Sequence, residues 1–270
     1  MLMIMVKTVL GLGGVYLLLV GFVALMQRDM IYHPGKTRTR PDEAGLPEMV
    51  PVPIKSADGW IATSWYAAPR SPGRPTVVFF HGNSGTLADR AHKARAFLDA
   101  GMGVLLVEYR GYGGNAGRPS ERGLYADAEA AMRWLIGQGV SSRRLVLYGE
   151  SLGSGIAMEM AIRYEVMMVV LESPFTSLAD LAPAYVLPPL AQLLTWDRYD
   201  NLIKAPSLRV PLLVVHGGKD TLVPVIMGHA VLNAADTIKE GLFLPEAGHN
   251  DLWEHGASKK ILDFIARRAL

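Results

Sequence analysis

The stretch Leu145-Val146-Leu147-Tyr148-Gly149-Glu150-Ser151-Leu152-Gly153 contains the pattern that decides the fold of this chain. Its first four residues predict a buried strand, and a helical pattern follows from Ser151 to Tyr164. Between them, Gly-x-Ser-x-Gly places Ser151 on a tight turn, where Gly149 and Gly153 let neighbouring chain approach closely. The hydroxyl group would then stand clear of the sheet, at the positive end of a helix. We therefore predict that Ser151 is a nucleophile. The alternative is a small-residue turn that only packs a helix on a sheet.

Strand and helix patterns alternate on both sides of this turn. Runs typical of strands are Met49–Ile54, Trp60–Tyr66, Thr76–Phe80, Val104–Tyr109, Leu145–Tyr148, Met167–Leu171, Pro211–Val215 and Leu242–Leu244. Helical spacing of apolar residues is found in Leu87–Leu98, Leu124–Ile136, Ser151–Tyr164, Pro224–Ala234 and Leu252–Ala269. The turn Ser56–Gly59 predicts a hairpin of the first two strands, and the later runs have the continuous apolar character of buried parallel strands. The predicted fold class is α/β, with an open, mostly parallel, doubly wound sheet of about eight strands.

A serine hydroxyl is a poor nucleophile until a base takes its proton, and His249 is the candidate for that base. It lies in the short glycine-containing loop Glu246–Asp251, after the last predicted strand. The other histidines lie in an irregular N-terminal segment, inside helical patterns or in strand-end turns: His33, His92, His229, His255, His81 and His216. We therefore predict that His249 acts on Ser151, with a surface histidine as the alternative.

The imidazole needs an acid that fixes its tautomer and stabilises the imidazolium. Asp220 fits this role, because it follows the predicted strand Pro211–Val215 in the loop His216–Asp220. The competing carboxylates are Asp251, expected to cap the last helix, and Asp200, in an irregular segment. We predict Asp220 as the acid.

A tetrahedral oxyanion is stabilised by two N–H donors, each worth about 3–4 kcal/mol in barrier lowering. One donor is expected to be the backbone of Leu152, directly after the predicted nucleophile. The second is expected from Asn83, in the turn His81–Gly85 that follows the strand Thr76–Phe80. An ordinary glycine turn is the alternative interpretation of that loop.

The N-terminus carries an uncharged run from Thr8 to Gln27 that is long enough for a membrane span, because twenty helical residues rise about 30 Å. A cleaved signal peptide usually has a shorter apolar region and an Ala-x-Ala-like site, which this run does not end in. Its four glycines disfavour a soluble core helix. We therefore predict a single-pass anchor at residues 1–28 that contacts membrane lipid. Lys7 precedes the run, whereas Arg28, Lys36, Arg38 and Arg40 follow it, which favours a cytoplasmic catalytic domain.

Composition narrows the remaining possibilities. Residues 29–48 lack apolar periodicity and are predicted to be a juxtamembrane linker, which leaves 49–270 as one catalytic domain. The formal net charge of +2 and the lack of long like-charge runs argue against a nucleic-acid partner. The chain has no cysteine, so disulfides, thiol nucleophiles and cysteine-ligated zinc sites are excluded.

Several further motifs accompany the serine turn: Phe79–Asn83, Tyr109–Gly113, Asn115–Glu121, Tyr125–Ala128 and Glu172–Ser177. Together they resemble the α/β-hydrolase superfamily, and more narrowly its membrane-anchored hydrolases related to serine aminopeptidases and protein depalmitoylases. The resemblance runs from about Arg28 to the C-terminus, and it includes the order Ser151, Asp220, His249. One departure is Glu108, where that pattern often has Asp. The resemblance implies an α/β-hydrolase fold and hydrolysis of an ester, thioester or amide through an acyl-enzyme, with no metal and no organic cofactor.

We therefore expect a serine hydrolase that cleaves a carboxylic ester or thioester in a small-molecule or acylated substrate. The alternatives are a serine peptidase or amidase on the same fold, and an inactive membrane-tethered binding module. Specificity is expected from the segment between Glu172 and Pro211, which could cover the pocket. Its apolar residues are Leu187, Pro188, Pro189, Leu190, Leu193, Leu194 and Trp196. They suggest acyl chains or lipid-derived esters, unless they are simply helix core.

Overall fold

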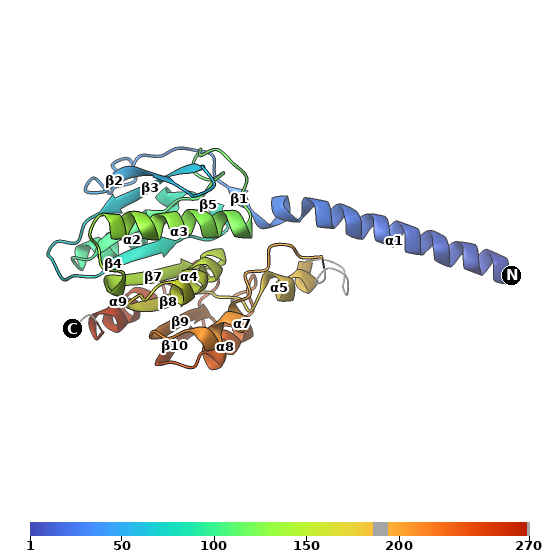
Figure 1. Cartoon of the computed structure of the whole chain (residues 1–270). Coiled ribbons are helices and arrows are strands. Elements are labelled where there is room, and N and C mark those ends of the chain that lie inside the picture. Colours follow the sequence, from blue (N-terminus) through green and yellow to red (C-terminus); the bar gives the residue numbers. More distant parts are fainter. Residues whose placement is uncertain (186–193, 269–270) are drawn as a thin grey trace.

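The computed structural model describes residues 1–185 and 194–268, and an eight-stranded sheet forms its centre (Figure 1). The strands are β2 (Val50–Lys55), β3 (Ile61–Ala67), β4 (Thr76–Phe80), β6 (Gly103–Val107), β7 (Leu145–Glu150), β8 (Met168–Glu172), β9 (Leu212–Gly217) and β10 (Lys239–Leu244). Their order across the sheet is β10-β9-β8-β7-β4-β6-β3-β2. Strand β3 pairs antiparallel with β2 and β6, whereas the other neighbours are parallel. The predicted fold class is confirmed.

Helices cover both faces of the sheet, which is why its central strands are apolar on both sides. On one face, α2 (Ala91–Asp99) and α9 (Ala257–Ala266) bury side chains such as Phe97 and Phe264. On the other face lie α3 (Glu121–Gly137), α4 (Leu152–Arg163) and α8 (Val225–Ala234), with Leu124 and Ile156 in the core. The shorter helices are η1 (Leu87–Arg90), η2 (Ser142–Arg144), α5 (Leu178–Tyr185), α7 (Asn201–Lys204) and η3 (Ala205–Ser207).

Several element ends differ from the sequence prediction, and two of these differences have a clear physical reason. Strand β10 begins at Lys239, three residues before the predicted start, because polar residues at this sheet edge hide the strand pattern. The last helix begins at Ala257 after Gly256, whose φ of 85° only glycine adopts easily, so neither Asn250 nor Asp251 is its N-cap. Asp251 instead accepts a hydrogen bond of 2.7 Å from the Gly248 N–H and holds the loop that carries His249.

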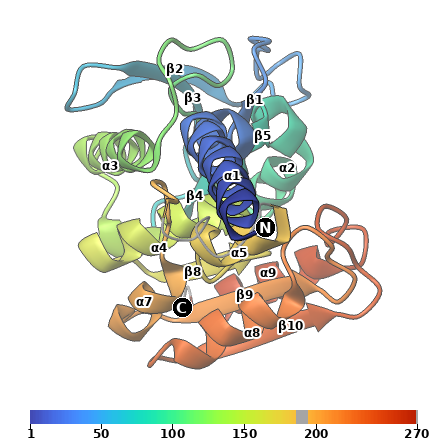
Figure 2. The ribbon, with the colours of Figure 1, turned by 90° about the vertical axis from the view of Figure 1, so that its right-hand side faces the viewer.

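Helix α1 (Leu2–Ile31) projects from the domain beside α5 (Figure 1), and Figure 2 looks along its axis. Its 30 residues are long and apolar enough to cross a membrane. Most of the helix is exposed, but Val20 and Gln27 are buried where its last turns reach the domain. The segment that follows is packed on the domain rather than extended away from it, because Tyr32, Leu46 and Met49 are buried.

A short parallel pair attaches the end of α1 to the domain. Strand β1 (His33–Pro34) pairs with β5 (Ser84–Gly85), directly after the turn that contains Asn83. The His33 N–H donates to the Asn83 carbonyl at 2.8 Å, and the Gly35 N–H donates to the Gly85 carbonyl at 2.9 Å. The chain leaving α1 therefore supports one of the turns predicted to bind the oxyanion.

Candidate active site

Ser151 stands on the sharp turn between β7 and α4. Its φ of 50° and ψ of −115° lie in a region that a non-glycine residue rarely adopts. The Ser151 N–H donates to the Glu172 carbonyl at 2.8 Å, which ties the turn to β8. A Cβ on Gly153 would lie 2.0 Å from the Phe80 carbonyl oxygen, and one on Gly149 would lie 2.5 Å from the Gly153 oxygen. Both glycines are therefore needed for the close approach that holds the serine.

The structure brings His249 and Asp220 to Ser151. The loop after β10 places the Nε2 atom of His249 3.0 Å from the Ser151 Oγ. The loop after β9 places Asp220 Oδ2 2.6 Å from the Nδ1 of His249. The other oxygen of Asp220 accepts from the backbone N–H groups of Leu222 at 2.9 Å and Val223 at 2.7 Å. Both oxygens of the Asp220 carboxylate are thus engaged in hydrogen bonds, one with the backbone and the other with His249.

The electrostatic environment keeps Asp220 ionised. Burial alone raises its pKa, but hydrogen bonds from His216 and His249, together with the Val223 N–H, lower the pKa below its ordinary value. A carboxylate can only accept, so the Nδ1 of His249 carries the hydrogen, and in the neutral imidazole the Nε2 then faces Ser151 with a lone pair. This is the tautomer in which an imidazole can take a proton from a hydroxyl.

The two predicted oxyanion residues line the same cavity as Ser151 and His249. Leu152 is the first residue of α4, where an N–H group has no partner within the helix. Asn83 is held by three hydrogen bonds: its carbonyl accepts from the Tyr112 hydroxyl at 2.7 Å and from His33, and its side-chain amide donates to the Ile31 carbonyl at 2.7 Å. The turn that carries Asn83 is therefore fixed from both α1 and the domain.

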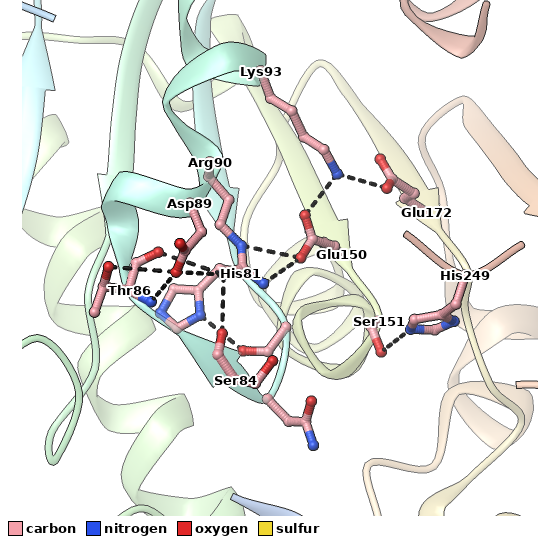
Figure 3. A network of polar contacts seen from close by, with 12 residues as sticks. His81, Ser84, Thr86, Asp89, Arg90, Lys93, Glu150, Ser151, Glu172 and His249 are labelled. Carbon is pink, nitrogen blue, oxygen red and sulfur yellow. Dashed lines mark hydrogen bonds and ion pairs between the residues drawn. The ribbon is translucent and has the colours of Figure 1, made fainter. Parts of the chain in front are cut away.

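A buried chain of alternating charges lies beside Ser151 (Figure 3). Arg90 contacts Glu150 at 2.7 Å, Glu150 contacts Lys93 at 2.7 Å, and Lys93 contacts Glu172 at 2.6 Å. Burial alone raises the pKa of Glu150, but the charges of Lys93 and Arg90 bring it below its ordinary value. Burial lowers the pKa of Lys93, yet the charges of Glu172 and Glu150 raise it above the ordinary value. Arg90, Lys93 and Glu150 are therefore ionised and paired with one another, and Glu172 completes the chain of contacts through Lys93.

The sequence interpretation missed both this charge chain and His216. The residues of the charge chain come from separate elements, and no local spacing in the sequence connects Arg90 and Lys93 with Glu172. His216 was given no role, although its position four residues before Asp220 at the end of β9 was a usable signal. Of the apolar residues expected to cover the pocket, Leu194 lines the cavity, whereas Leu187, Pro188, Pro189, Leu190 and Leu193 lie outside the described residues.

The cavity over Ser151 has a volume of about 590 Å³ and is bounded by the loops after the strands and by the end of α1. This volume is in the range of sites for small molecules. Within residues 1–185 and 194–268, no group of three or more His, Asp and Glu side chains is arranged to hold a metal ion.

Comparison with known proteins places the chain in a family. The family model described as serine aminopeptidase, S33, matches residues 71–201. An uncharacterized protein of Mycobacterium tuberculosis is 40% identical over 233 residues, which cover 85% of this chain and 83% of that protein. Alpha/beta hydrolase domain-containing protein 17B of Xenopus laevis is 30% identical over 200 residues, which cover 71% of this chain and 66% of that protein.

A solved structure agrees with the fold. The esterase Pf2001 of Pyrococcus furiosus superposes with a TM-score of 0.70, covering 88% of this chain and 100% of that one. At 18% identity this likeness concerns the fold alone. From the sequence relatives and the shared fold together, the chain belongs to the α/β-hydrolase superfamily and is an enzyme of the α/β-hydrolase type.

Proposed function

We propose that this chain is a serine hydrolase that cleaves a carboxylic ester or thioester through an acyl-enzyme on Ser151. The observation that carries the proposal is the continuous contact from Asp220 through His249 to the Ser151 Oγ, with distances of 2.6 Å and 3.0 Å. In the proposed reaction, His249 takes the hydroxyl proton while the oxygen attacks the substrate carbonyl, and Asp220 stabilises the imidazolium.

The remaining steps use the same groups. The N–H groups of Leu152 and Asn83 are proposed to stabilise the oxyanion, and the protonated His249 delivers its proton to the leaving alcohol or thiol. Water then loses a proton to His249 and attacks the acyl carbonyl, which releases the carboxylic acid and restores Ser151. No redox partner or additional reactant is required in this scheme.

The cavity favours an ester or thioester over the free N-terminus that an aminopeptidase binds. A substrate ammonium group needs an unengaged acceptor, preferably a carboxylate. Glu150 is the carboxylate that lines the described part of the cavity, and its two oxygens already contact Arg90 and Lys93. Arg90 lines the cavity as well, and its positive charge disfavours a second cation nearby. Peptidase or amidase activity is therefore the second choice, and an inactive binding module is the third.

We also propose that α1 anchors the enzyme in a membrane as a single span, with residues 49–270 as the catalytic domain. The length and apolar character of α1 support this placement. The basic residues that follow the helix favour the cytoplasmic face for the domain.

Labelling with a fluorophosphonate probe tests the proposed chemistry in the full-length chain, purified in detergent. The wild type and a Ser151→Ala variant are compared with Ser154→Ala, a matched control one turn into α4 whose hydroxyl contacts Asn201 at 3.2 Å rather than His249. We expect labelling and hydrolysis of short p-nitrophenyl esters in the wild type and the control, and neither in Ser151→Ala. A folded wild type that neither reacts nor hydrolyses would favour the binding module. Faster turnover of aminoacyl amides than of acyl esters would favour the peptidase.

A further inference from the structure

One wall of the cavity over Ser151 is formed by the N-terminal helix. The α1 residues that line it are Val20, Val23, Ala24, Gln27, Met30 and Ile31. They lie in the last turns of the helix, and all but Gln27 are apolar. Figures 1 and 2 show that α1 meets the domain beside α5, which contributes Leu178 and Leu181 to the same cavity. The helix therefore projects from the domain and also forms part of the pocket over Ser151.

The pocket combines polar and apolar lining groups. On the side of the serine, His249 contacts the Ser151 Oγ at 3.0 Å, and Arg90 belongs to the charge chain beside it (Figure 3). The wall formed by α1, Leu178, Leu181 and Leu194 is apolar apart from Gln27. Such a lining suits an amphiphilic substrate, whose reacting carbonyl lies near the serine and whose apolar part removes hydrocarbon surface from water.

The apolar part of the pocket lies at a depth where lipid is expected. Val20, Val23 and Ala24 belong to the uncharged run that ends at Gln27, and Arg28 is the first charged residue after it. In a spanning helix, Arg28 lies at the membrane surface and the residues one to two turns before it lie within the adjoining leaflet. Trp196 is exposed and lies 5.8 Å from the guanidinium of Arg28, a position typical of interfacial tryptophans.

Polar contacts fix α1 in this position. The Gln27 side-chain amide donates to the Leu194 carbonyl at 3.1 Å, and its oxygen accepts from the Trp196 N–H at 2.8 Å. Arg28 pairs with the buried Asp197 at 2.9 Å, and the Tyr32 hydroxyl donates to the same carboxylate at 3.0 Å. The Leu194 carbonyl, the Trp196 N–H and the Asp197 carboxylate therefore all bind side chains of α1. These contacts hold the end of the helix firmly against the domain.

We propose that the pocket binds the acyl chain of a membrane-embedded long-chain ester or thioester, which enters from the adjoining leaflet between α1 and the Leu178–Leu181 turn. The chain lies along Val20, Val23 and Ala24, and its carbonyl reaches Ser151 at the membrane surface. This substrate class rests on the hydrolase function proposed above for Ser151.

Two alkyl fluorophosphonates, one with a long chain and one with a short chain, test the proposal on the full-length protein in lipid nanodiscs. An Ala24→Trp variant fills the pocket beside α1, and Leu25→Trp is the matched control, because Leu25 is 71% exposed and does not line the cavity. We expect Ala24→Trp to slow long-chain labelling at least about tenfold while short-chain labelling changes less than about twofold. Leu25→Trp is expected to leave both rates unchanged.

The outcomes separate the two proposals. If the wild type reacts with neither probe, the hydrolase function fails. If the wild type reacts with both, and Ala24→Trp leaves long-chain labelling unchanged or slows both probes equally, the acyl-chain site fails while the hydrolase function stands. Ala24→Leu, a smaller change, provides the same comparison if the tryptophan variant does not fold. A long-chain probe with a terminal diazirine is expected to crosslink to α1, and crosslinks found only in α4 or α8 would overturn the proposed path.

Discussion

The Nε2 atom of His216 lies 3.2 Å from Asp220 Oδ2, the carboxylate oxygen that also contacts His249. The same nitrogen lies 2.9 Å from the Val223 carbonyl oxygen. Both neighbours are acceptors, so the Nε2 of His216 carries a hydrogen that it shares between them. His216 is buried at the end of β9, and it therefore holds the carboxylate in the orientation that His249 requires.

Replacing His216 tests this positioning role. In His216→Phe we expect kcat/KM for a short ester to fall about 10- to 100-fold, because a hydrogen bond to a charged group contributes about 1.5–3 kcal/mol. The loss is expected in kcat, with KM nearly unchanged, since His216 does not line the cavity. His216→Gln keeps a donor near the same place and is expected to recover part of the activity. An equal loss in both variants, or a change confined to KM, would contradict the positioning role.

The close contacts of the glycines at the serine turn predict a large loss of stability when even a single methyl group is added. We expect Gly153→Ala to destabilise the fold by more than about 3 kcal/mol or to prevent folding, because its Cβ would overlap the Phe80 carbonyl. Gly137→Ala is the control, since a Cβ on this residue at the end of α3 meets nothing within 4 Å. That change is expected to be neutral or to stabilise by about 0.5–1 kcal/mol in urea unfolding. Similar midpoints for the two variants would contradict the close-approach argument.

The charge chain beside Ser151 predicts that the free energy of unfolding depends strongly on the pairing of its charges. Lys93→Met leaves Glu150 and Glu172 with one cation fewer, and we expect it to cost about 3–5 kcal/mol in the free energy of unfolding. Adding Glu172→Gln removes one of the stranded charges, so the double variant is expected to be more stable than Lys93→Met alone. The control is Lys259→Met, which breaks an exposed pair with Asp263 and is expected to cost less than about 0.5 kcal/mol. Calorimetry or urea unfolding measures all three, and a double variant no more stable than the single one would argue against buried charge pairing.

The ion pair between Asp58 and Arg110 predicts how stability changes with pH. Hydrogen bonds from Arg110, 2.6 Å and 2.9 Å long, lower the pKa of Asp58 to about 2. A carboxyl pKa that is lower in the folded chain contributes stability above its unfolded value near 4, and that contribution disappears as the pH falls toward 2. Because Asp58 is about half exposed, screening limits the effect to about 1 kcal/mol.

We therefore expect Asp58→Asn to be less stable than the wild type at pH 7, by a difference that shrinks as the pH falls from about 4 toward 2. Urea unfolding at pH 7, 4 and 3 measures the difference, and Asp236→Asn, at an exposed carboxylate, serves as the control. A difference that grows as the pH is lowered would have the wrong sign for this ion pair.

Sequence patterns predicted the sheet well where a strand is buried on both faces. Strand β4 begins and ends at the predicted residues Thr76 and Phe80, because a continuous apolar run leaves one interpretation. Strand β10 was predicted too short, since it lies at the sheet edge, where the exposed Lys239 and Gly241 alternate with the partly buried Glu240 and Leu242. The last helix was predicted five residues too early, because turns after Leu252 imitate the apolar spacing of a helix.

The site could be predicted only where a local pattern marks it. Ser151, Asp220 and His249 each follow a strand in a short loop, and the structure brings them together, although their catalytic roles remain predictions. The contacts of Glu150 with Arg90 and Lys93 depend on three-dimensional packing across about 60 residues of sequence, which no periodicity records. The same reason explains why α1 was predicted as an anchor but not as part of the pocket.

The pairing of His33–Pro34 with Ser84–Gly85 limits how this protein can be divided into parts. An unrelated anchor could be spliced on ahead of Val20, where α1 makes little contact with the domain. A junction placed after Ile31 would instead replace the pocket wall and the helical turn that positions the Ile31 carbonyl for the Asn83 side chain. The proposed anchor and the hydrolase domain therefore form one structural unit: the first half of α1 can change independently of the domain, whereas its second half must change together with it.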